Sequence, residues 1–86
     1  GKISYVPIGF ELLPRKFTLT QLQKLYEQVL GQKLDKRNFR RKILSMDLLI
    51  MLDEFQQDVS HRAARLFKFD KQRYQELKDK GFSFNL

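Results

Sequence analysis

The feature that most constrains the fold is a pair of short, capped helices that the sequence encodes between residues 18 and 45. Thr18 is a natural N-cap, and Gln21 three positions later completes a capping box. The apolar stripe after the cap has the spacing of a helix packed along one side and consists of Leu22, Leu25, Tyr26, Val29 and Leu30. Gly31 supplies the left-handed residue that ends such a helix. We therefore expect a first helix over residues 19–30.

A second helix is predicted over residues 36–45, after a short turn. Asp35 can cap its first turn, and its apolar anchors are Phe39, Ile43 and Leu44. Two short helices joined by a tight, glycine-containing turn form a helix-turn-helix unit.

A β-hairpin with a long tip is predicted next. Residues 48–52 form a short apolar run bounded by acids, and a second strand is expected within residues 63–69. The polar stretch 53–62 lies between them. Helix, helix and hairpin is the order of a winged helix-turn-helix domain, so we expect a mainly α fold with a small β-hairpin (α+β).

The two ends of the chain also carry apolar anchors. A last helix is expected over residues 71–80, capped by Asp70, anchored by Tyr74 and Leu77 and ended by Gly81. The tail is expected to fold back onto the core through Phe82, Phe84 and Leu86. Within the lead-in of residues 1–14, residues 2–14 contain two prolines and a glycine, which predicts an ordered, irregular segment docked by Tyr5, Ile8, Phe10 and Leu13. We interpret this lead-in as the connection from an upstream domain, and residues 15–86 as the winged-helix domain.

Basic charge is concentrated in about a third of the chain. The 86 residues carry a net charge of +7, from 17 Lys and Arg against 10 Asp and Glu. Residues 15–46 hold nine of these cations and only two acids, which accounts for the whole excess. A localised basic patch indicates a polyanionic partner.

The strongest candidate site is the run Lys36-Arg37-Asn38-Phe39-Arg40-Arg41-Lys42 in the second helix. At about 100° per residue, the face opposite the apolar anchors carries Arg37, Asn38, Arg41, Lys42 and Ser45. Arginine pairs with guanine and asparagine with adenine in the major groove, so this face suits base recognition. Lys36 and Arg40 project nearer the apolar edge, as phosphate contacts or internal braces. The alternative is a solvated helix face, which is how most charge runs are used.

Two further regions could touch DNA. Thr18 and Thr20 open the first helix, where free backbone N–H groups can receive a phosphate, although capping explains Thr18 and solvent exposure explains Thr20. The predicted wing, residues 53–65, carries His61, Arg62 and Arg65, which could contact the backbone or the minor groove. Its acids oppose such contacts and are Asp53, Glu54 and Asp58.

The composition argues against several other classes of protein. The chain has no cysteine and a single histidine, so it offers neither a zinc site nor a catalytic thiol. Glycine-rich phosphate-binding loops are absent and the glutamates are scattered, so we expect no cofactor, no metal and no catalysis. No apolar run approaches the roughly 18 residues of a membrane span, which fits a cytoplasmic protein.

Four stretches resemble the C-terminal winged-helix domain of the Nudix-related transcriptional regulators, namely residues 7–14, 16–27, 34–44 and 61–70. The resemblance implies an upstream Nudix-type domain that senses a nucleotide or sugar metabolite, and a dimeric bacterial repressor or activator. It places the family's helix motif on Arg37, Asn38, Arg40, Arg41 and Lys42. It places the wing motif on residues 61–67, where this chain has Val-Ser-His-Arg-Ala-Ala in the loop and Phe67 in place of the common tyrosine. Any hydrolase activity would belong to the upstream domain.

Two functions follow from this reading. The leading one is a DNA-binding domain whose second helix enters the major groove of a half-site, with a homodimer on a palindromic operator. The alternative is a protein-docking or dimerisation module without sequence-specific DNA binding, since winged helices are reused for both. RNA binding is disfavoured because the sequence shows no exposed aromatic platform.

Overall fold

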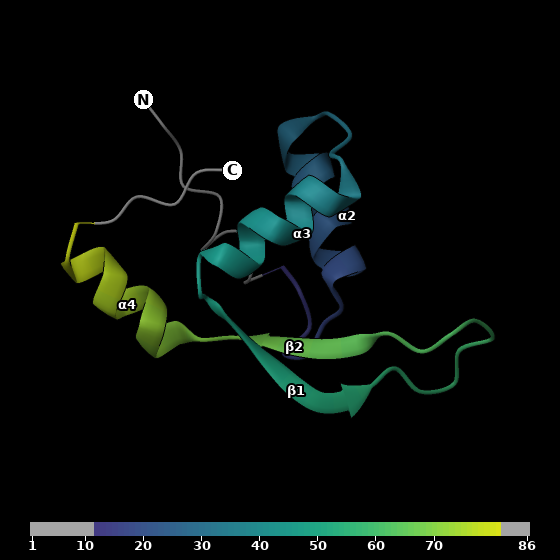
Figure 1. The fold of residues 1–86 in the computed structure, drawn as a ribbon. Coiled ribbons are helices and arrows are strands. Elements are labelled where there is room, and N and C mark those ends of the chain that lie inside the picture. The colour runs from purple at the N-terminus through teal and green to yellow at the C-terminus, as the bar shows by residue number, and fades with distance from the viewer. Residues whose placement is uncertain (1–11, 82–86) are drawn as a thin grey trace.

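The computed structural model describes residues 12–81, and its elements follow the predicted order (Figure 1). The elements are α2 (Leu19–Leu30), α3 (Lys36–Ser45), β1 (Leu49–Phe55), β2 (Arg65–Phe69) and α4 (Lys71–Asp79). In Figure 1, α2 and α3 lie above the two-stranded sheet, α4 continues from the end of β2, and the hairpin tip projects away from the helices. This is the winged-helix fold that the sequence predicts. Within residues 12–81 no helix is long and apolar enough to cross a membrane.

The predicted helix caps are present. The Thr18 hydroxyl accepts a hydrogen bond from the Gln21 backbone N–H at 3.1 Å, and the Gln21 side chain accepts one from the Thr18 N–H at 2.8 Å. Asp35 and Asp70 cap α3 and α4 through single hydrogen bonds, which their side chains accept from the backbone N–H groups of Asn38 and Arg73. Gly31 has φ of 70°, the left-handed conformation that the end of α2 requires.

The main core lies where α2 and α3 cross above the sheet. Its buried members are Phe17, Leu19, Leu22, Tyr26, Phe39, Ile43 and Phe67. The rings of Tyr26 and Phe39 join the two helices, with centroids 5.8 Å apart. A smaller cluster of Leu48 and Leu77 fixes α4 against the start of the hairpin.

The sheet is antiparallel and gains a short third partner. Leu49 pairs with Phe69 and Met51 with Phe67, and the register then shifts before Phe55 pairs with Arg65. On the other edge of β2, Phe17 and Phe67 exchange backbone hydrogen bonds of 2.9 and 2.7 Å. The residues just before α2 are therefore fastened to the sheet.

Three sequence predictions are wrong in detail. Val29, expected in the packed apolar stripe of α2, is 38% exposed. Leu44, expected as a core anchor, is 48% exposed, because Ile43 faces the core and the next residue points about 100° away. The first strand covers residues 49–55 instead of 48–52, since Phe55 still pairs across the hairpin, and the second begins at 65. Leu13 packs against the main core as expected. The other expected terminal anchors lie outside the described residues, and the domain division stays a prediction.

Candidate nucleic-acid interface

One face of α3 is a cationic surface held in place by the core on its other side. Phe39 and Ile43 are buried, whereas exposed side chains on α3 include Lys36, Arg37, Asn38, Arg41 and Lys42. Among residues 12–81, no cation of α3 forms an ion pair. This face therefore keeps its positive charge available to a ligand.

Asn38 and Arg41 are linked on this face. The Arg41 guanidinium donates a hydrogen bond to the Asn38 side-chain oxygen at 3.0 Å. The two residues are one helical turn apart, so the pair presents an arginine fork and an amide side by side. These are the two side-chain types that form bidentate contacts with base edges.

Arg40 braces α3 against α2. Its guanidinium donates to the Thr20 hydroxyl at 3.3 Å, and its buried Nε atom has no hydrogen-bond partner among the described residues. Of the two roles expected for Arg40, a phosphate contact or an internal brace, this hydrogen bond is of the kind that a brace makes. Thr20 is exposed beside this contact, whereas Thr18 is only 2% exposed and its hydroxyl serves the cap. The surface at the start of α2 is therefore formed by Thr20 and Arg40, without the side chain of Thr18.

Glu27 fixes the turn between the helices, a role that the sequence reading missed. Its carboxylate accepts hydrogen bonds from the Leu34 N–H at 2.8 Å and from the Gln23 amide at 3.4 Å. The bond from Leu34 is the main cause that lowers the pKa of Glu27. A signal for this role was available: a carboxylate in the last turn of a helix is disfavoured by the helix dipole, which suggests another partner.

The wing offers fewer available cations. His61 and Arg62 are exposed near its tip, with His61 Nδ1 2.9 Å from the Arg62 carbonyl oxygen. Arg65 instead contacts its own hairpin, donating to the Leu52 carbonyl at 3.0 Å and lying over the Phe55 ring. Acids accompany this region, since residues 46–58 contain four carboxylates and no basic side chain.

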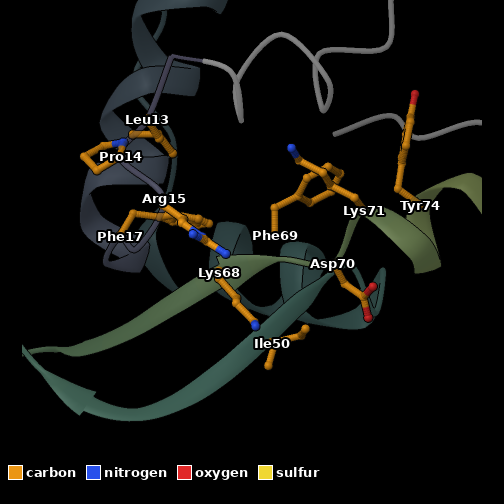
Figure 2. A pocket seen from close by; sticks show the side chains of 10 residues that line it. All are labelled: Leu13, Pro14, Arg15, Phe17, Ile50, Lys68, Phe69, Asp70, Lys71 and Tyr74. Carbon is orange, nitrogen blue, oxygen red and sulfur yellow. The ribbon is translucent and has the colours of Figure 1, made fainter.

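A groove also lies beside the sheet. Figure 2 shows side chains from the segment before α2, both strands and the start of α4 around it, and it encloses about 960 Å³. Its polar side chains are Arg15, Lys68, Asp70, Lys71 and Tyr74, of which Asp70 already caps α4. Residues 12–81 contain no group of three or more side chains able to hold a metal ion.

A helix-turn-helix whose second helix exposes cations that have no acidic partner among residues 12–81, followed by a two-stranded hairpin, defines the winged-helix class of DNA-binding domain. Residues 9–69 match the family described as the NrtR DNA-binding winged helix domain, and the chain belongs to that family. This confirms the resemblance to the Nudix-related regulators.

Two relatives that match the chain are longer than it is. It is 36% identical over 74 residues to the ADPR responsive transcriptional repressor NtrR of Acinetobacter baylyi, which covers 86% of this chain and 29% of that protein. The crystal structure of Shewanella oneidensis NrtR complexed with a 27mer DNA is similar with a TM-score of 0.70 and 30% identity, over 84% of this chain and 32% of that one. The chain therefore spans about three tenths of the length of each relative.

Proposed function

We propose that this domain binds an operator half-site by placing α3 in the major groove. The observation that carries the proposal is the exposed face of α3, whose cations have no acidic partner among the described residues. The similar Shewanella oneidensis protein was crystallised with DNA, which supports the same use here.

Each surface has a proposed role. Arg37, Asn38, Arg41 and Lys42 contact base edges, because they share the outer face of α3. Lys36, Arg40 and Thr20 contact phosphates at the edge of the groove. His61 and Arg62 contact the flanking backbone from the wing, while Arg65 and Thr18 have structural roles.

The whole regulator is proposed as a cytoplasmic homodimer on a palindromic operator. An upstream Nudix-type domain would bind the effector, and ADP-ribose is the candidate because the Acinetobacter baylyi relative is ADPR responsive. Repression is the proposed sign of regulation for the same reason. The domain itself acts by binding, without a cofactor or a catalytic step.

The test is a selection of the domain against random duplex DNA at near-physiological salt. We expect enrichment of a defined half-site. The logarithm of the association constant should fall linearly with the logarithm of the salt concentration, with a slope of about −0.9 for each phosphate contacted. A variant with Arg37→Ala and Arg41→Ala should no longer enrich this half-site. The variant with Lys78→Ala and Lys80→Ala removes the same amount of charge from α4 and its exposed end, and it should still enrich this half-site.

Two outcomes would contradict the proposal. Flat, salt-sensitive retention of all sequences would leave phosphate contacts alone and exclude base recognition by this domain. No retention of any duplex would favour the protein-docking alternative.

A further inference from the structure

The direction of the wing is determined at one irregular point of the hairpin. From Met51 to Phe55 β1 advances four positions, while the partner residues of β2, Phe67 and Arg65, are two positions apart. Residues 52–54 have no partner in the register and form a bulge in β1. A bulge bends its strand and increases the local twist. The arms of the wing leave the sheet just beyond this bend.

Arg65 spans this bulge with a single side chain. Its Nη1 atom donates to the Leu52 carbonyl at 3.0 Å and lies 3.8 Å from the Asp53 carboxylate. Its guanidinium carbon lies 4.6 Å from the centre of the Phe55 ring. The side chain therefore contacts the first two residues of the bulge and the residue that follows it.

The next contact is already at the base of the tip. The Gln56 N–H donates to the Ala64 carbonyl at 2.9 Å, and the Ala64 N–H donates to the Gln56 side chain at 3.2 Å. From there the tip projects away from the helices (Figure 1). A small change of angle at the bulge is thus a larger displacement at His61 and Arg62.

We propose that Arg65 is a positioning residue that sets the direction of the wing relative to α3. It acts on DNA through the wing, and its guanidinium does not itself contact DNA. Arginine suits this role because its planar guanidinium can stack on the ring while its N–H groups donate to the carbonyl. The effect on DNA rests on the function proposed above, whereas the positioning is a property of the free domain.

The first experiment measures the direction of the wing without DNA. The chain has no cysteine, so Gln28→Cys on α2 and Gln57→Cys in the wing give a clean pair of sites for spin labels. We expect a narrow distance distribution that becomes broader or shifts in Arg65→Lys, and also in Phe55→Leu, which leaves the charge unchanged.

Arg73→Lys is the matched control. Arg73 is 36% exposed against 37% for Arg65 and also pairs with carboxylates, but it lies on α4. Arg73→Lys should leave the distance distribution between the two spin labels unchanged. The proposal would be overturned if Arg65→Lys and Phe55→Leu gave the same distance distribution as the unmutated domain. Circular dichroism would show that each variant is folded.

The second experiment compares two duplexes of the selected operator, one with its flanks and one trimmed to the base pairs under α3. Arg65→Lys should lower affinity for the flanked duplex about twofold to fivefold, the size of an exposed cation–π contact, and leave the trimmed duplex unchanged. An unchanged affinity for the flanked duplex would overturn the effect on DNA. Failure of the unmutated domain to bind either duplex would contradict the proposed function, and the spin-label distances would still decide the positioning role.

Discussion

Helix α3 and the wing both carry cations, but the two regions use them differently. No cation of α3 forms an ion pair among residues 12–81, and of its basic side chains only Arg40 and Arg41 have hydrogen bonds there. At the base of the wing, Arg65 is engaged by its own hairpin, and Glu54 pairs with Lys16 at 2.7 Å. The count of positive charges in a segment therefore does not tell how many are available to a ligand.

The difference has a physical cause in what lies opposite each cation. A helix that buries one stripe exposes the other, and the charges on its outer face point to solvent. In a hairpin, by contrast, side chains on facing strands lie close enough to pair. Arg65 faces Phe55 across the strands, with Asp53 close by, so its charge is used locally.

The largest expected effect comes from removing the anchor that holds α3 in place. Ile43 is fully buried in the main core, and Ile43→Ala should lower the free energy of unfolding by about 2–5 kcal/mol. The neighbouring Leu44→Ala should cost far less, because that side chain is half exposed. Denaturant unfolding of both variants measures the difference, and equal losses would contradict the placement of α3.

The next largest effect is on DNA binding, and it distinguishes the cations of α3 from those of the wing. Arg41→Ala should weaken operator binding by about 1–3 kcal/mol and relax the preference for the selected sequence. Arg62→Ala should cost less than about 1 kcal/mol and affect all sequences equally. Competition binding against specific and random duplexes tests this order, and a larger loss of specificity for Arg62 would reverse the comparison.

A pH-dependent effect is expected from the turn that orients α3. Because the pKa of Glu27 is lowered below its ordinary value of 4.5, its bond to Leu34 stabilises the fold above that value and is lost as pH falls through the lowered pKa. Glu27→Gln can still accept the bond but cannot titrate. The variant should therefore lose less stability than the unmutated domain between about pH 6 and about pH 3, as followed by denaturant unfolding. Parallel losses in the two proteins would exclude this role.

The smallest effect concerns the acids of the wing. Asp58 adopts a left-handed φ of 57°, which asparagine also tolerates, so Asp58→Asn removes the charge without straining the tip. We expect DNA affinity to rise by about 0.2–1 kcal/mol at low salt, with the gain disappearing at high salt. Asp79→Asn, on α4, is the control and should change less. A loss of affinity in Asp58→Asn would mean that the tip carboxylate makes a favourable contact.

The sequence predicts those parts of the fold that depend on near neighbours. The capping box of Thr18 and Gln21, the left-handed Gly31 and the N-cap Asp35 each act within one turn, and all are present. The core stripe of α2 is predicted for the same reason, through Leu22 and Tyr26.

The remaining features depend on residues far apart in the chain. The extension of β1 to Phe55 requires pairing with Arg65, and the polar residues between them suggest a loop when taken alone. Likewise, the contact between Arg40 and Thr20 exists only because α2 and α3 cross. The exposed face of α3 was predictable because periodicity fixes it, whereas the availability of Arg65 depended on its partner across the hairpin.

The uneven distribution of charge gives the domain a preferred orientation before any contact is made. The basic face of α3 has no acidic partner among residues 12–81, whereas Asp47, Asp53 and Glu54 each form an ion pair with a basic side chain, so unbalanced positive charge remains on α3. In the field of a polyanion, this uneven distribution of charge experiences a torque that turns α3 towards the nucleic acid. This alignment operates over roughly a Debye length, about 8 Å at physiological ionic strength. More of the diffusional encounters should therefore begin in a productive orientation than chance alone would give.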